Sequence, residues 1–148
     1  MIRIMANTNA LKEIEQYVRS WCLSKYGVEF ENQEKELRLI TGGLHKFDVV
    51  SKDGTIVAGI KTSALRENGK VGVGVIKSTF TELYFLSLIK ASTKLMILTN
   101  KGYYEHFEKI SRGKVADVIK IIHCPLPQDA QEKIAIVHRN CRKEIGRR

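Results

Sequence analysis

Long apolar segments are missing from this sequence. Its 148 residues contain no run approaching the roughly 20 consecutive apolar residues that a membrane-spanning helix needs. The first residues, MIRIMANTNALKEIEQ, include no apolar secretory core and turn acidic too early for a signal peptide. We therefore expect a cytoplasmic protein without a membrane partner.

Proline is also scarce, and its placement bears on the domain organisation. The two prolines, Pro125 and Pro127, stand close together near the end of the chain. No Pro- or Gly-rich linker, internal repeat or low-complexity segment divides the rest. A chain of this length fits one domain with a sizeable buried core. We expect a single domain over residues 1–148.

Cysteine is too rare for a disulfide framework. The chain has three cysteines, and an odd number without a secretory context predicts free thiols in a reducing compartment. Zinc is a weak alternative, because the spacing of the available ligands matches no zinc finger. Residues 123 and 124 would also point to opposite faces of a strand. The ligands considered are His123, Cys124, His138 and Cys141.

Acidic residues are outnumbered by basic ones. The chain has 25 Lys and Arg residues against 16 Asp and Glu residues, a formal net charge of +9. Such an excess favours a polyanionic partner, since each neutralised phosphate releases counterions. Nucleic acid is the first expectation, ahead of an anionic membrane surface. A basic protein without such a partner is the alternative.

Hydrophobic periodicity predicts an α/β protein with a mixed central sheet flanked by helices. Leu11, Ile14, Val18 and Trp21 recur at helical spacing, and a Lys52-Asp53-Gly54 turn joins two β-rich runs. Early antiparallel strands followed by crossover helices indicate helices on both faces of the sheet. The predicted order is a helix over 8–27, strands over 36–41, 46–51 and 55–63, a helix over about 78–91, a strand over 94–100, a helix over 101–111, a strand over 117–126 and a helix over 128–145.

The candidate catalytic residues lie in the predicted hairpin KFDVVSKDGTIVAGIKTS, residues 46–63. Asp48 stands among apolar residues on the first strand, and Lys61 ends the second. A Mg²⁺ ion held by carboxylates and a backbone carbonyl stabilises a phosphoryl transition state and activates water. A neighbouring lysine orients that water or neutralises the phosphate. The residue types therefore suit phosphodiester hydrolysis.

The hairpin and the order of elements resemble the PD-(D/E)XK nuclease superfamily, whose restriction-endonuclease-like core is αβββαβ. Its motif is an aspartate, a variable gap, then acid-any-lysine. Here it reads Asp48, ten residues, and Gly59-Ile60-Lys61, followed by Thr62 and Ser63. The resemblance covers residues 8–100 and leaves an added α-β-α at the end. The motif alone has low specificity, because Asp and Lys flank many hairpin turns.

Carried over residue by residue, the resemblance implies a site for Mg²⁺ or Mn²⁺. Asp48 and the carbonyl of Ile60 would be metal ligands, and Lys61 would be the motif lysine. The second acid falls on Gly59, which has no side chain to offer. This departure weakens the expected metal binding, since one carboxylate holds Mg²⁺ poorly.

Three explanations of Gly59 stay open. Glu82, the only acid in a largely apolar helix, would supply the missing carboxylate as some restriction enzymes do, or it merely faces solvent near the helix start. Glu15 in the first helix matches a glutamate of many relatives, although Glu13 competes with it. Alternatively, the acid has been lost from position 59, where a glycine inside a strand is otherwise a weak choice.

Basic and glycine-rich segments near the hairpin form a candidate DNA-contacting rim. Glycines let backbone approach a phosphate chain closely. The C-terminal Arg139, Arg142, Lys143, Arg147 and Arg148 are either a further contact or a solvated tail. The predicted rim residues are His45, Lys46, Ser63, Arg66, Lys70 and Lys77.

The sequence thus favours a DNA-binding, Mg²⁺-dependent endonuclease that acts on duplex or branched DNA through Asp48, Lys61 and a displaced acid, Glu82 before Glu15. A catalytically inactive nucleic-acid-binding module on the same fold is the alternative, and an unrelated α/β interaction protein is the third reading. A homodimer would present one site to each strand of a duplex, although no residue identifies an interface.

Overall fold

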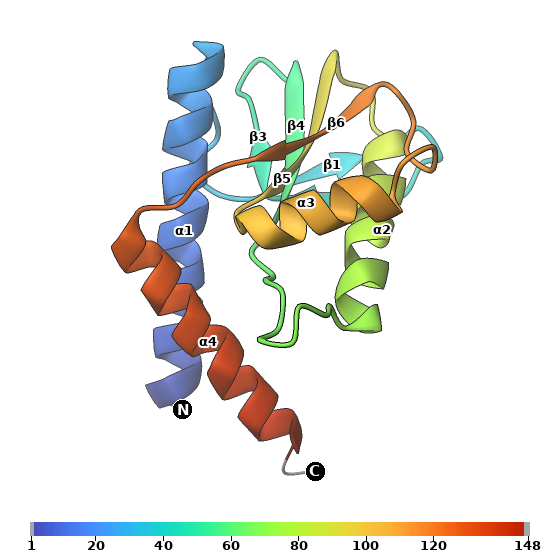
Figure 1. Cartoon of the computed structure of the whole chain (residues 1–148). Coiled ribbons are helices and arrows are strands. Elements are labelled where there is room, and N and C mark those ends of the chain that lie inside the picture. The colour runs from blue at the N-terminus through green and yellow to red at the C-terminus, as the bar shows by residue number, and fades with distance from the viewer. Residues whose placement is uncertain (1, 147–148) are drawn as a thin grey trace.

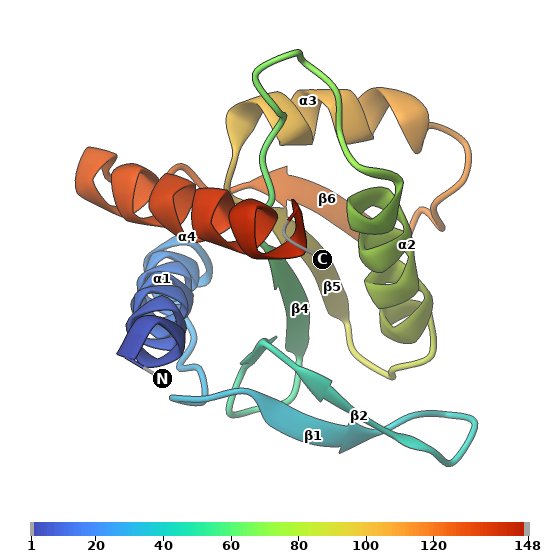
Figure 2. The same cartoon turned by 90° about the horizontal axis from the view of Figure 1, so that it is seen from below.

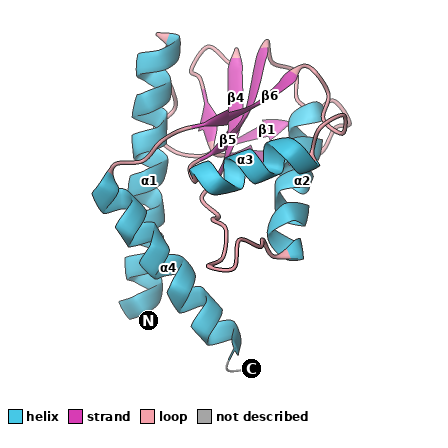
Figure 3. Cartoon of the chain, viewed as in Figure 1, coloured by secondary structure: helices cyan, strands magenta, loops and turns pink. Residues whose placement is uncertain are grey.

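The chain folds as a mixed α/β structure, as the sequence predicts. The computed structural model describes residues 2–146, with side chains placed for residues 9–139. Its elements, shown in Figures 1 and 3, follow the predicted order with one extra break in the early strands. They are α1 (Ile2–Tyr26), β1 (Lys35–Arg38), β2 (Leu44–Phe47), β3 (Val49–Val50), β4 (Ile56–Lys61), α2 (Val73–Ser87), β5 (Thr93–Leu98), α3 (Lys101–Ile110), β6 (Ile119–His123) and α4 (Gln128–Gly146).

The central sheet has the strand order β3-β4-β5-β6. β3 pairs antiparallel with β4, whereas β4, β5 and β6 are parallel. The turn before β4 adopts the predicted hairpin, with Gly54 at a φ of 74° and Asp53 accepting hydrogen bonds from Ser51 and Thr55. β1 and β2 form a separate two-stranded antiparallel sheet. None of the helices described here is long and apolar enough to cross a membrane.

Two hydrophobic cores lie on the two faces of the central sheet. Ile14 and Val18 of α1 pack with Ile134 of α4 on one face, and Leu83 of α2 packs with Phe107 of α3 on the other. Figure 2 shows this division, with α1 and α4 on one side of the sheet and α2 on the other. Because side chains alternate along β4, the placement of its apolar residues fixes which way Gly59 and Lys61 face.

The alternation along β4 directs Gly59 and Lys61 toward α2. Ala58 and Ile60 belong to the core beneath α1 and α4, and Val57 belongs to the core beneath α2 and α3. Lys61, four residues after Val57, shares its face. Gly59 and Lys61 therefore face the helix that carries Glu82.

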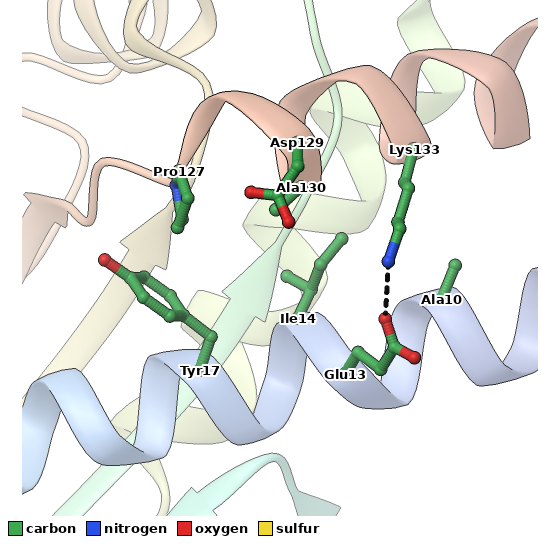
Figure 4. A pocket seen from close by; sticks show the side chains of 8 residues that line it. All are labelled: Ala10, Glu13, Ile14, Tyr17, Pro127, Asp129, Ala130 and Lys133. Carbon is green, nitrogen blue, oxygen red and sulfur yellow. Dashed lines mark hydrogen bonds and ion pairs between the residues drawn. The ribbon is translucent and has the colours of Figure 1, made fainter.

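The α1–α4 contact closes the opposite face and leaves a small pocket between the two helices. Figure 4 shows Ile14 of α1 pointing toward α4 and Lys133 of α4 reaching Glu13 at an Nζ–Oε2 distance of 3.2 Å. Both charged side chains are more than half exposed, so this ion pair adds little stability. The packing of the apolar side chains holds α4 in place.

The predicted strand 46–51 is wrong in one respect, because it breaks at Asp48. Phe47 and Val50 both lie in the core beneath α2 and α3, whereas Val49 faces the other core. Strict alternation would have placed Phe47 with Val49. The chain thus carries an irregularity of the bulge type at Asp48, which re-aims its backbone and side chain.

Arg19 of α1 holds this break in place. Its Nε and Nη2 donate to the carbonyl oxygen of Asp48 at 3.1 and 2.7 Å, and its Nη1 donates to the carbonyl of Asn32 at 3.2 Å. The Arg19 residue is only 6% exposed. These bonds satisfy the Asp48 carbonyl at the break and the carbonyl of Asn32, which precedes β1.

The second helix begins earlier than predicted. The sequence indicates a helix over about 78–91, but α2 spans Val73–Ser87, so Lys77 lies on the helix and not in the glycine-containing loop. Gly72 and Gly74 are typical of a loop, yet Val75 and Ile76 pack against the core beneath α2. Apolar burial outweighs the low helix propensity of glycine here.

We predict that Arg19→Met destabilises the fold by about 2 kcal/mol, because it leaves the partly buried carbonyl of Asp48 without its two donors and removes one of the two donors to the Asn32 carbonyl. Urea unfolding would measure the loss. Lys12→Met, an exposed substitution on the same helix, serves as the control and should change the free energy of unfolding little. Equal stability of the two variants would show that Arg19 does not hold the break at Asp48.

Candidate active site

Glu82 occupies the space that Gly59 leaves open. A Cβ atom added to Gly59 would lie 2.6 Å from the Cγ of Glu82 and 3.1 Å from its Oε1. The Glu82 side chain is 13% exposed, so the interpretation of Glu82 as a solvent-facing helix residue is wrong. Gly59 also has a physical reason other than a lost acid, since any larger residue would collide with Glu82.

The Glu82 carboxylate has one partnered and one unpartnered oxygen. Oε2 lies 3.1 Å from Nε2 of His45, whereas Oε1 is buried without a hydrogen-bond partner among the described residues. Burial raises the pKa of Glu82, and the hydrogen bond and charge of His45 oppose that rise. Asp48 raises the pKa further and Lys61 lowers it. The two motif residues are thus close enough to act on Glu82 electrostatically.

β3 pairs with Val57 and Ala58 but not with the rest of β4, and Asp48 lies beside that unpaired part of the strand edge. Its Oδ2 accepts the Ile60 N–H at 2.8 Å, in place of a backbone carbonyl. Burial raises the pKa of Asp48, while this hydrogen bond and then Lys61 lower it. Because the N–H and C=O of one strand residue project to the same side, the Ile60 carbonyl faces the same edge.

Lys61 converges on this place from the end of β4. Its Nζ donates to the Ser78 Oγ of α2 at 2.8 Å, and Ser78 lies one helical turn before Glu82. The half-buried Lys61 is therefore held against the same helix as the displaced acid. Asp48, Lys61 and Glu82 therefore lie close enough for their charges to act on one another.

Glu15 belongs to α1, which packs on the face of the central sheet opposite to α2 and Glu82. It lies on α1 with its side chain 32% exposed, and its Oε2 is 3.7 Å from Arg19 Nη2. Burial and then the charge of Asp48 raise its pKa. Glu15 is thus a neighbour of Asp48, but the space at Gly59 is filled by Glu82.

The predicted DNA-contacting rim is only partly assembled. His45 is not a free rim residue, because it stacks on Phe85 at a ring-centroid distance of 4.0 Å and contacts Glu82. Exposed Lys46 lies 3.9 Å from Glu34. Arg66 and Lys70 are exposed on a turn closed by a backbone hydrogen bond between them. Lys77 is exposed on α2 beside Ser78, and Ser63 is half-buried just after β4.

Two predicted features fall partly outside the described side chains. Of the C-terminal basic residues, Arg139 is exposed, and the side chains of Arg142, Lys143, Arg147 and Arg148 are not among those described. The same holds for Cys141. Cys22 and Cys124 are buried free thiols, and burial raises their pKa to about 11 and about 12.

Few groups at this site are able to bind a metal ion. Across residues 9–139, no group of three or more His, Cys, Asp or Glu side chains is arranged to hold a metal ion. The two carboxylates of Asp48 and Glu82, with the Ile60 carbonyl, are oxygen donors of the type that Mg²⁺ prefers, and Mg²⁺ keeps several of its waters. The unpartnered Oε1 of Glu82 fits a role as a ligand, since a buried carboxylate oxygen without a partner is costly.

Sequence reasoning missed the roles of His45, Ser78 and Arg19. The contacts of His45 with Glu82 and of Ser78 with Lys61 join distant segments, and no local pattern reports them. The burial of Arg19 could have been predicted, because it lies beside Val18 on the apolar face of α1. A lone arginine on such a face predicts a buried hydrogen-bonding role.

Comparisons with protein-family models, with curated proteins and with solved structures gave no match to this chain.

We predict that Glu82→Gln stabilises the metal-free protein by about 1 kcal/mol near neutral pH, because it removes a buried charge and keeps an acceptor for His45. The raised pKa of Glu82 gives the sign. The Glu82 carboxyl group of the native protein contributes fully to stability below its pKa in the unfolded chain. This contribution is lost as the pH rises through its pKa in the folded protein. The advantage of the variant should thus vanish in acid and grow toward neutrality.

Urea unfolding in EDTA, compared between acidic and neutral pH, measures the effect. Glu105→Gln, an exposed change on α3, should show no such growth with pH. A Glu82→Gln variant that is less stable than the native protein at the higher pH would contradict this account of Glu82.

Proposed function

We propose that this protein is a DNA-binding, Mg²⁺-dependent endonuclease that hydrolyses phosphodiester bonds. The observation that carries the proposal is the position of Glu82, whose carboxylate fills the space at Gly59 beside Asp48 and Lys61. This is the place where the PD-(D/E)XK pattern expects its second acid. The displaced acid restores the charge that the motif lacks in sequence.

Asp48, Glu82 and the Ile60 carbonyl would hold Mg²⁺ or Mn²⁺. When bound, such an ion stabilises negative charge on the phosphoryl group and lowers the pKa of a coordinated water. The protein contributes the fixed orientation of its ligands. Ile60 N–H and Arg19 fix Asp48 through its side chain and its carbonyl, and His45 fixes Glu82. Partners of this kind orient metal ligands and tune their affinity.

Lys61 supplies a positive charge beside the two carboxylates. Ser78 holds its ammonium group at 2.8 Å, and a bound phosphate would compete for the same group. In this position the lysine would orient the attacking water or neutralise the phosphate oxygens.

The charge of the chain supports DNA as the substrate. The net charge of +9 favours binding of a polyanion. Arg66, Lys70 and Lys77, exposed on the loop after β4 and on α2, would contact phosphates on one side of the site, with Lys46 and Ser63 nearer β2 and β4. A homodimer would bring two such sites to duplex or branched DNA.

A catalytically inactive DNA-binding module is the second candidate. It is favoured by the internal pairing of the site, where His45 engages Glu82 and Ser78 engages Lys61. In such a module the site would have become a structural cluster. DNA binding would then persist without metal and without cutting, with the strong salt dependence of phosphate contacts.

An acid-relocation experiment tests the first proposal. Glu82→Ala should lower Mg²⁺-dependent cleavage of plasmid or branched DNA by at least about 100-fold, and Lys61→Met should have a similar effect. Gly59→Glu combined with Glu82→Ala should recover at least about tenfold over Glu82→Ala, because the alanine frees room for a glutamate at position 59. Gly59→Glu alone should gain nothing, since Glu82 already fills that space.

Mn²⁺ affinity measured by calorimetry supplies a readout that does not depend on cleavage, and it should follow the same order. Glu105→Ala is the matched control for loss of a surface acid. Salt-sensitive DNA binding without cleavage in every variant would establish the inactive module instead. Full activity of Glu82→Ala would refute the displaced acid.

A further inference from the structure

A second pocket opens at the carboxyl ends of β4, β5 and β6. Its volume is about 520 Å³, and it lies between these strand ends and α4, on the side of the molecule where α4 and the loop after β4 both lie in Figure 1. His138 of α4 places its Nε2 2.9 Å from the carbonyl oxygen of Thr62, which follows Lys61. The pocket is therefore the neighbour of the candidate active site across the end of β4.

The polar groups of this pocket suit an anion. α3 begins at its wall, and Asn100 caps the helix by accepting the Tyr103 N–H at 2.9 Å. The N–H groups of Lys101 and Gly102 have no acceptor among the described residues, as expected for the first turn of a helix. The positive end of the helix and the Lys101 ammonium favour negative charge, and no Asp or Glu lines the pocket.

Thr99 gives an independent indication of a ligand. It lines the pocket and is only 5% exposed, and its hydroxyl has no hydrogen-bond partner within residues 9–139. No described group engages this hydroxyl, so it is free to bond a ligand in the pocket. His123 lines the same pocket and offers a ring nitrogen, whereas Nε2 of His138 on the pocket wall is already engaged with the Thr62 carbonyl. The spacing of these two histidines and their neighbouring cysteines matches no zinc finger. Cys124 lies in the core beneath α1 and α4 and does not line the pocket.

The remaining wall is apolar and too large for a bare ion. Leu126, Ile134 and Pro125 line it, and pockets of this volume hold small organic ligands. We propose that the pocket binds a nucleotide, with its phosphate at the start of α3 near Thr99 and Lys101 and its sugar or base against the wall formed by β6 and α4. Its assignment to the terminal nucleotide of a DNA strand rests on the proposed function, whereas nucleotide binding itself does not.

Binding measured in EDTA separates this proposal from cleavage. A labelled single-stranded oligonucleotide with a 5′-phosphate should bind about tenfold more tightly than the same strand with a 5′-hydroxyl, which corresponds to one charge-assisted contact network. Deoxyadenosine 5′-monophosphate should compete for the site. Thr99→Val, which keeps the shape of the side chain, and Lys101→Met should each abolish most of the preference. Lys109→Met in the last turn of α3 is the matched control and should preserve it.

Equal affinity for the two strands, together with no competition by the mononucleotide, would overturn the proposal. Mononucleotide binding that depends on Thr99 and Lys101, without a preference for the phosphorylated strand, would confirm the nucleotide site and refute its assignment to a strand end. Because no metal is present, these results stand whether or not the protein cuts DNA.

Discussion

The burial of the Glu82 carboxylate against Gly59 is the constraint on which the site depends. A charged side chain that is 13% exposed, with one oxygen lacking a partner among the described residues, is costly unless something compensates for it. His45 compensates one oxygen, and Lys61 offsets part of the charge. A metal ion would compensate the other oxygen. One oxygen of this acid is thus left without a partner among the described residues.

The break at Asp48 serves the same site from the other strand. It gives up a ladder hydrogen bond, so that the Asp48 carboxylate takes the Ile60 N–H and Arg19 takes the Asp48 carbonyl. Arg19 of α1 and Ile60 of β4 thereby fix Asp48, and His45 of β2 fixes Glu82. Ligands held in this way lose little conformational entropy on binding.

Much of the fold was predictable because its signals are local. Apolar spacing located the helices, and the Asp53-Gly54 turn located the β3–β4 hairpin. The break at Asp48 escaped prediction, because Arg19 imposes it from a distant helix. The start of α2 was misplaced because Gly72 and Gly74 obscured the apolar spacing of Val75, Thr79, Leu83 and Leu86. That spacing, once recognised, puts residue 82 beside the buried face. Glu82 could be matched to Gly59 because it is the only acid in a largely apolar helix, whereas its contact with His45 had no sequence signal, because the two residues lie in separate segments.

The central claim, that the acid missing from position 59 is supplied by Glu82, is tested most directly by crystals soaked in Mn²⁺ and measured at the manganese absorption edge. The account predicts an anomalous peak between the carboxylates of Asp48 and Glu82, close to the Ile60 carbonyl. A peak bound by Asp48 and Glu15 on the α1 side, or no peak at Asp48 at saturating Mn²⁺, would contradict it.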